Sequence, residues 1–198
     1  MSKPKDTFVN MVLTLLIITA VAAISLGYVY ELTKKPIDDA KKQKLEKAIG
    51  EVVPKFTSIK EFKVKPKTGE DSLTFYQAIN NGKLVGTAIK SYTDNGFGGR
   101  IWIIVGFTDD GTVINYQILE HHETPGLGSK TAFWFKDTLN TSRSIINKNP
   151  GKVKFIVTKD GGDIDAITAS TISSRAFLDA VRRAYDTFIN FKSKGGDK

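Results

Sequence analysis

The sequence predicts an α+β domain of antiparallel β-hairpins with packed helices, tethered to one N-terminal transmembrane helix. Three observations predict this fold class. The chain opens with a long uncharged run, its middle carries apolar segments around Asn-Gly and Asp-Gly turns, and an amphipathic segment lies near its end. A chain of 198 residues has room for one such domain and its membrane helix.

The composition is that of a globular protein with a hydrophobic core. Hydrophobic residues make up 40% of the chain and charged residues 25%, which argues against overall disorder. The net charge of +8 comes from a lysine-rich surface, without the arginine-and-aromatic pattern of a nucleic-acid groove. We therefore expect the lysines to solubilise the surface, and we expect no nucleic-acid partner.

The chain contains no cysteine. This excludes disulfides, thiolate zinc sites, cysteine-ligated iron–sulfur clusters and the Cys-x-x-Cys-His attachment of haem. Any redox chemistry would therefore depend on an organic cofactor or on a metal held by oxygen and nitrogen.

The first expected element is a transmembrane helix at residues 8–30, after a short tail at residues 1–7. No residue from Thr7 to Tyr30 is charged, and at about 1.5 Å per residue such a helix covers the ~30 Å hydrocarbon core. The alternative is a signal peptide, because Ala20-Val21-Ala22 offers a small-x-small cleavage site. The apolar run continues past that site, which favours a retained anchor.

The charges leave open on which side of the membrane the rest of the chain lies. Lys3 and Lys5 precede the span, whereas five lysines follow it between residues 34 and 44. A positive-inside count would keep the following domain in the cytoplasm. Long domains are translocated largely regardless of charge, so the count does not decide the orientation.

A connecting helix is expected at residues 31–50, with Ile37, Leu45 and Ile49 on one face and Gly50 at its end. Two hairpins follow, one pairing residues 73–79 with 84–92 and the other pairing residues 101–108 with 112–119. The remaining expected elements are a helix at residues 131–139, a short strand at 153–158, a closing amphipathic helix at 173–190 and a flexible tail at 193–198.

A hydroxyl-rich segment, DAITASTISS at residues 165–174, lies directly before the closing helix. Its hydroxyl residues are Thr168, Ser170, Thr171, Ser173 and Ser174. The start of a helix has unpaired backbone N–H groups and the positive end of the dipole, so it suits a phosphate. Simple helix capping is the commoner use of such residues, and the segment alone favours capping.

A second segment, HHETPGLGSK at residues 121–130, follows an expected strand. Pro125-Gly126 indicates a tight turn, and the glycines would let the backbone approach a ligand closely. A plain loop is the alternative. His121, His122 and Glu123 are adjacent, so on an extended segment their side chains point to opposite faces, and we expect no metal site there.

These two segments, in this order, resemble the FMN-binding domain shared by the G subunit of the Rnf electron-transport complex and the C subunit of the sodium-pumping NADH:quinone reductase. The stretch IWIIVGFTDDGTVINYQILEHHETPGLG is similar to that family's hairpin and the loop after it. The resemblance covers the membrane helix and most of the remaining chain, and it implies an FMN-binding domain at residues 51–192.

The resemblance implies a covalent flavin. The family motif is usually Asp-x-hydrophobic-Ser/Thr-Gly-Ala-Thr, with FMN esterified through its phosphate to the last threonine, which is Thr171 here. Ala169 stands where the motif has Gly, and Ser170 where it has Ala. The attachment site would comprise Thr168, Ala169, Ser170 and Thr171. The wall near the flavin would comprise Glu123, Thr124, Gly126, Leu127 and Gly128. Possible ring contacts are Phe97, Phe133 and Trp134, with core packing favoured for the last two.

The function implied is that of an electron-carrying subunit of an ion-translocating ferredoxin:NAD oxidoreductase, the Rnf complex. The Rnf subunit is favoured over its quinone-reductase relative because the chain has no large insert between anchor and hairpins. The implied partners are other subunits of the complex, a flavin transferase and the membrane, with the domain outside the cytoplasm at a bacterial inner membrane. The alternatives are a membrane-anchored binding module without cofactor and an FMN reductase acting alone.

Overall fold

The computed structural model describes residues 7–196, which form two compact units, one ending at Lys44 and one beginning at Leu45. The expected N-terminal tail lies outside the described residues except for its last residue, and so do the last two residues of the expected C-terminal tail. The division of the chain into domains made from the sequence stays a prediction.

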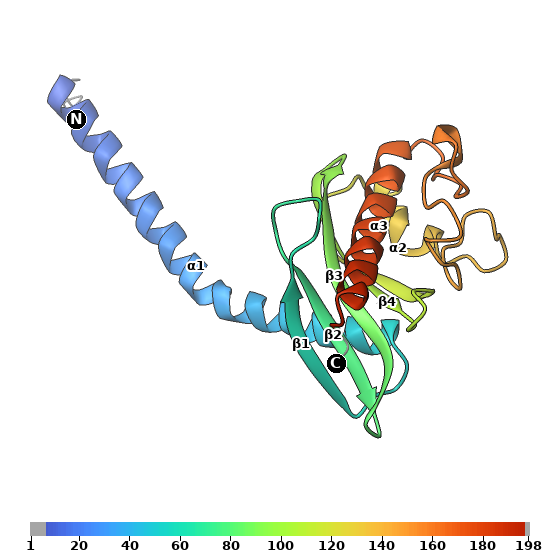
Figure 1. Ribbon diagram of the computed structural model, residues 1–198. Coiled ribbons are helices and arrows are strands. Elements are labelled where there is room, and N and C mark those ends of the chain that lie inside the picture. The colour runs from blue at the N-terminus through green and yellow to red at the C-terminus, as the bar shows by residue number, and fades with distance from the viewer. Residues whose placement is uncertain (1–6, 197–198) are drawn as a thin grey trace. The chain divides into compact units, whose positions relative to one another are not determined.

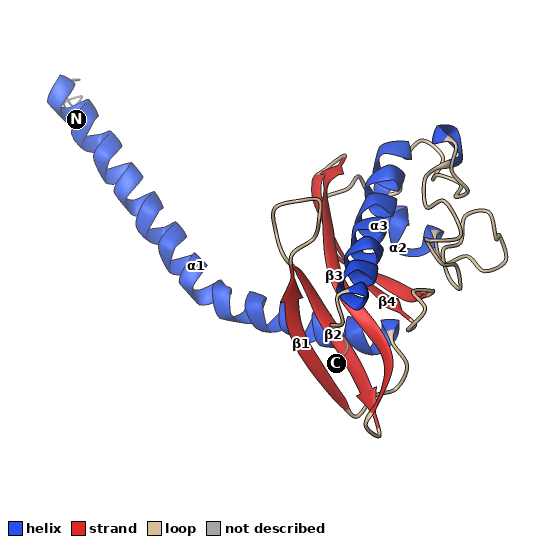
Figure 2. Cartoon of the chain, viewed as in Figure 1, coloured by secondary structure: helices blue, strands red, loops and turns tan. Residues whose placement is uncertain are grey.

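Figures 1 and 2 show the order of the helices and strands. Their bounds are α1 Phe8–Val52, β1 Ser58–Val64, β2 Leu73–Asn80, β3 Lys83–Gly96, β4 Gly99–Phe107, β5 Val113–Glu120, η1 Gly128–Lys130, α2 Thr131–Trp134, η2 Thr158–Asp160 and α3 Thr171–Ser193.

Helix α1 is continuous over 45 residues and covers both the expected span and the expected connecting helix. By length and composition it could cross a membrane, and the apolar window near its N-terminus has no residue buried within the protein. Gly50 does not end the helix, which continues to Val52. The last turns bury Ala48, Ile49 and Val52, and this packing stabilises the helix beyond the glycine.

The described residues form an antiparallel sheet in the order β1-β2-β3-β4-β5, so each strand pairs with its neighbour in the sequence. Both predicted hairpins are confirmed. At the first turn Asn81 and Gly82 have φ of +49° and +76°, as a two-residue hairpin turn requires. Strand β1 was not predicted. It is an edge strand whose residues are mostly exposed and rich in lysine, so it lacks a strong hydrophobic signal.

Alternating residues of the sheet build two hydrophobic clusters, one on each face. On one face Phe75, Ile89 and Ile103 belong to the main core, which includes the inner side of α3. On the other face Tyr76, Ala88 and Ile104 pack with the residues at the end of α1. The sheet therefore carries α3 on one face, as Figure 1 shows for β3 and β4.

Helix α3 confirms the predicted closing helix and is slightly longer than expected at both ends. Its inner face is formed by the buried residues Ser173, Ser174, Ala176, Phe177, Leu178, Ala180, Val181, Ala184, Thr187 and Phe188. Phe177 stacks on Phe135 with ring centroids 4.6 Å apart. This contact joins the helix to the segment between β5 and α3.

Two predictions for the segment between β5 and α3 are wrong. The helix expected at residues 131–139 ends after Trp134, because the Asp137 carboxylate accepts hydrogen bonds from the backbone of Leu139 and Asn140 in a turn that competes with the helix. Residues 153–158 form no strand. Their backbone bonds to the loop that follows, and Val157 makes only an isolated bridge with Ile164.

Candidate functional site

The two sequence segments meet at one cavity of about 410 Å³. Its lining residues are Phe97, Glu123, Thr124, Leu127, Gly128, Ala169, Ser170, Thr171, Ile172 and Ser173. The fold thus brings together seven of the nine expected site residues, while Gly126 and Thr168 are absent from this lining. A volume in this range suits a cofactor-sized ligand.

The loop after β5 is held in shape by its own backbone. Gly126 has φ +75°, which glycine adopts freely, and its N–H donates to Ser129 Oγ at 2.9 Å. The N–H groups of Leu127 and Ser129 both donate to the carbonyl of Thr124. Gly126 therefore shapes the turn that presents its neighbours to the cavity, although it does not line the cavity itself.

The far end of this loop is anchored in the core. The Thr131 hydroxyl donates to the carbonyl of Gly128 at 2.8 Å, and the Tyr116 hydroxyl donates to the carbonyl of Thr131 at 2.6 Å. Tyr116 is fully buried, and burial raises the pKa of its phenol. The neutral phenol is thus part of the support beneath the cavity wall.

Glu123 is the buried acid of the cavity, with an exposed fraction of 4%. One carboxylate oxygen accepts the N–H of Gly98 at 2.9 Å, and the other accepts the hydroxyl of Ser173. Gly128 lies so close that a Cβ there would overlap both Glu123 Oε2 and Ser173 Oγ. The β3–β4 hairpin, the loop after β5 and the start of α3 are therefore packed around the carboxylate of Glu123.

The hydroxyl-rich segment divides into buried and accessible groups. Ser170, Ser173 and Ser174 are buried, and their hydroxyls bond within the protein. Thr168 is exposed and Thr171 is half-buried. Ser170 occupies the N-cap position of α3, but its hydroxyl bonds to Ser173 Oγ instead of capping the backbone. The simple capping interpretation therefore does not explain this segment.

Ala169 has φ +60°, the left-handed conformation that favours glycine. This residue stands where the related family motif has glycine, and its conformation gives a physical reason for that preference. An alanine there has a steric cost of about 1–2 kcal/mol. The backbone is held in this shape just before α3, between the two accessible threonines.

A second cavity, of about 350 Å³, is also lined by Thr171. Its other lining residues are Trp134, Asn140, Arg143, Thr158, Lys159, Asp165, Ala166, Ile167, Thr168 and Ala169. The guanidinium of Arg143 lies 4.4 Å from the Trp134 ring centroid and is ion-paired with Asp137. Trp134 and Thr168 thus belong to this cavity, whereas Phe133 is 61% exposed and lines neither.

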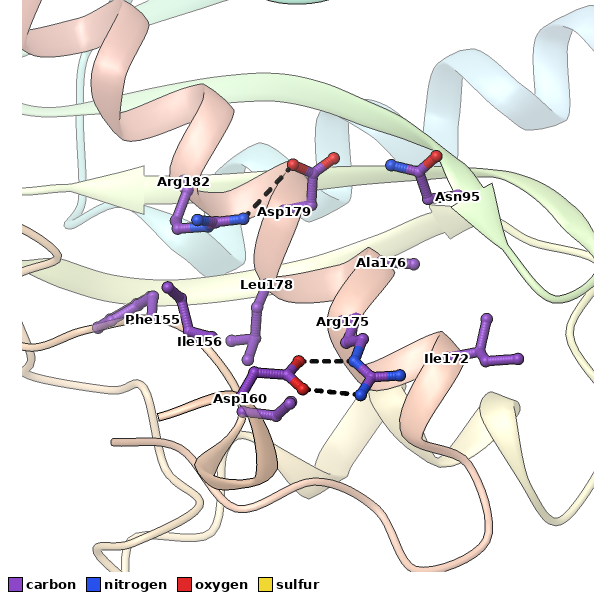
Figure 3. Close-up of a pocket in the computed structure, with 11 residues that line it drawn as sticks. Asn95, Phe155, Ile156, Asp160, Ile172, Arg175, Ala176, Leu178, Asp179 and Arg182 are labelled. Atoms are coloured by element: carbon purple, nitrogen blue, oxygen red, sulfur yellow. Dashed lines mark hydrogen bonds and ion pairs between the residues drawn. The ribbon is translucent and has the colours of Figure 1, made fainter. Parts of the chain in front are cut away.

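A third cavity, of about 370 Å³, adjoins the first at Ile172, which lines both. In Figure 3 Asp160 and Arg175 face each other in a two-bond ion pair, and Asp179 faces Arg182. Sequence reasoning missed Ile172. The sequence signal for Ile172 is that it is an apolar residue at the start of the closing helix, where it is 50% exposed.

Within residues 7–196 no group of three or more His, Cys, Asp or Glu side chains could hold a metal ion. The site can instead hold an organic group. The first cavity has a predominantly apolar rim of Phe97, Leu127 and Ile172, and the second has cationic residues, with a threonine hydroxyl shared by both. An amphipathic ligand with a flat apolar part and an anionic part fits this arrangement.

A cavity with an apolar rim beside one with cationic residues suits a cofactor-binding domain, and comparison with known proteins defines the class as a domain that binds a flavin nucleotide. The family model of the FMN-binding domain matches residues 96–186, a range that contains all lining residues of the first cavity. The fold class and the FMN-binding resemblance inferred from the sequence are thereby confirmed.

The relatives define the family more narrowly. The G subunit of the ion-translocating oxidoreductase complex of Aliivibrio fischeri is 34% identical over 88% of this chain and 86% of its own length. The G subunit of Escherichia coli is 34% identical over 60% of this chain and 58% of its own length. That of Erwinia tasmaniensis is 40% identical, but the match spans only about half of each protein, 54% and 51%. The chain belongs to the family of G subunits of ion-translocating oxidoreductase complexes.

Proposed function

We propose that this chain is the electron-carrying subunit of a membrane ion-translocating ferredoxin:NAD oxidoreductase, the Rnf complex, with FMN linked through its phosphate to Thr171. One observation carries the proposal. Thr171 lines both the cavity with the apolar rim and the arginine-containing cavity, so a group attached there could place its ring in one and its phosphate at the other. The names of the relatives support the same complex.

The accessibility of the hydroxyls supports Thr171 as the attachment residue. A transferase needs a hydroxyl that it can reach, and Ser170 has an exposed fraction of only 7% and donates to Ser173. Thr171 is half-buried, and its hydroxyl makes no hydrogen bond among residues 7–196. As the first residue of α3 it also lies where the helix dipole favours a negative phosphate.

FMN would supply the electron transfer, and this chain would bind and shield the ring. Phe97 and Leu127, with exposed fractions of 70% and 39%, would exclude water at the rim. Glu123 would hold the loop and helix α3 at a fixed separation. The subunit would pass electrons between redox centres of its partners and would not complete the reaction alone.

Helix α1 would anchor the subunit in a bacterial inner membrane, with the domain on the extracytoplasmic side. Its length and apolar composition support the anchor, whereas the orientation follows only from the family resemblance. A flavin transferase on that side would be the further partner. Protease added to intact spheroplasts should degrade the domain, and complete protection would contradict the orientation.

The test of the cofactor is the intact mass of the full chain, purified from cells with and without a flavin transferase. We expect one added flavin phosphate in the first case, and yellow fluorescence that persists on a denaturing gel. A chain of unmodified mass from cells that contain an active transferase would favour the alternative, a membrane-anchored module without cofactor.

A further inference from the structure

We infer that the cavity lined by Arg143 and Thr171 binds the phosphodiester of the flavin, and that Arg143 positions this phosphodiester. The inference rests on the proposed function and extends it to residues of the second cavity. Arg143 lies in the irregular segment after α2, far from both sequence motifs in the chain. Arg143 and Thr171 line the same cavity because the fold brings their two segments together.

Arg143 carries an unsatisfied buried donor. Among the described residues, two buried side-chain nitrogen atoms have no hydrogen-bond partner, Nε of Arg143 and Nε of Arg182. A buried donor without a partner is costly and rare, so each marks a guanidinium that can accommodate a further acceptor, such as a water or a ligand. Arg182 lines the third cavity, where Thr171 is not among the lining residues, whereas Arg143 shares its cavity with Thr171.

The guanidinium of Arg143 is held in place by an aromatic ring and an ion pair. It lies over the Trp134 ring, and the Trp134 indole N–H donates to the carbonyl of Asp165 at 3.0 Å. Nη2 of Arg143 donates to the Asp137 carboxylate, and this hydrogen bond lowers the pKa of Asp137. The ion pair and the ring hold a guanidinium whose side chain is 26% exposed and lines the same cavity as Thr171, so its accessible N–H groups can donate to a phosphate oxygen in a strong charge-assisted bond.

Two cationic side chains, Arg143 and Lys159, line the cavity together with one carboxylate, Asp165. Arg143 is also paired with Asp137 outside the lining. Cationic donors of this kind suit the negative oxygens of a phosphodiester. The oxygens of Asp165 accept the hydroxyls of Ser142 and Thr158, so this carboxylate is occupied by donors of its own.

The experiment compares full chains in detergent, produced with a flavin transferase, by phosphorus NMR of the linked phosphate. We expect Arg143→Gln to shift the resonance from its wild-type position and to reduce the rise in thermal unfolding temperature that flavin attachment causes. The matched control is Arg175→Gln. Arg175 is also near the start of α3 and is paired with one aspartate, Asp160, but it lines the third cavity. This control should keep the wild-type resonance.

A second variant separates positioning from general disturbance of the loop. Asp137→Asn weakens the ion pair that holds Arg143 but keeps the guanidinium, so it should shift the resonance less than Arg143→Gln does. The inference is overturned if Arg143→Gln keeps the wild-type resonance, or if Asp137→Asn shifts it as far as Arg143→Gln does. A wild-type chain without covalent flavin would instead overturn the proposed function, because there would be no linked phosphate to observe.

Discussion

The carboxylate of Glu123 accepts a hydrogen bond from the hydroxyl of Ser173, 50 residues further along the chain. The same carboxylate accepts the N–H of Gly98, at the tip of the β3–β4 hairpin. The loop, the helix and the hairpin that surround the first cavity are therefore connected through one buried side chain. This connection exists only in the folded domain, and four predictions test it and the groups around it.

Thr171→Val is expected to abolish covalent flavin while the domain stays folded. Valine keeps the shape of threonine and removes only the hydroxyl, which makes no hydrogen bond within residues 7–196. The substitution should cost well below the ~5–15 kcal/mol stability of a typical domain. Intact mass and circular dichroism measure the two effects.

The controls for this prediction are Thr168→Val and Ser170→Ala, which should both retain the flavin. Thr168 is exposed and lines only the second cavity, and the Ser170 hydroxyl is engaged with Ser173. Covalent flavin on the Thr171→Val chain, or its loss in Ser170→Ala alone, would show that the attachment residue is assigned wrongly.

Glu123→Ala is expected to destabilise the domain by about 1–3 kcal/mol, because it leaves the buried hydroxyl of Ser173 and the N–H of Gly98 without their acceptor. Urea unfolding followed by tryptophan fluorescence measures the change. Glu70→Ala is the control. Glu70 is exposed, and its replacement should change the stability by less than ~0.5 kcal/mol. Equal effects of the two substitutions would refute the role of Glu123.

Ala169→Gly is expected to stabilise the domain by up to ~1 kcal/mol. Glycine removes the steric cost of the left-handed conformation, about 1–2 kcal/mol, and this gain exceeds the ~0.4–1 kcal/mol that glycine adds to the entropy of the unfolded chain. The comparison is Ala166→Gly, at a residue without positive φ, which should destabilise. A lower midpoint of urea unfolding for Ala169→Gly would contradict the argument.

Tyr116→Phe is expected to make the stability less sensitive to alkaline pH. Burial raises the pKa of Tyr116 above its ordinary value of about 10. Because the unfolded chain ionises first, the stability from this residue is fully present below pH ~10 and is lost as the pH rises further. The variant should lose about 1 kcal/mol at neutral pH, since the hydrogen bond to Thr131 disappears.

Unfolding free energies measured between pH 8 and about 11 would check this prediction. Part of the alkaline slope should persist in the variant, because burial also raises the pKa of Tyr76, to about 12. Identical slopes for the variant and the wild type would show that Tyr116 makes no contribution to the pH dependence.

Local patterns in the sequence were sufficient for the two hairpins, the apolar helix and α3. The Asn81-Gly82 and Asp110-Gly111 turns predicted both hairpins, because such turns match the twist of the strands they join. The uncharged run predicted the apolar helix, and the apolar stripe predicted α3, because both depend on neighbours within a few residues. Seven of the nine residues expected from the two motifs line the first cavity, and their role in binding FMN stays a prediction.

The tertiary structure decided the features that depend on distant partners. Strand β1 exists through its pairing with β2, and the segment before α3 takes its irregular path through bonds such as the Asp137 turn. No local pattern marks Arg143 as a neighbour of Thr171, because their proximity comes from packing between segments that are separate in the sequence. The sequence by itself thus determined the two hairpins, the apolar helix, α3 and the family. The folded chain alone determined which hydroxyl stays accessible and which arginine lies beside it, because burial and cavity lining are properties of packed segments.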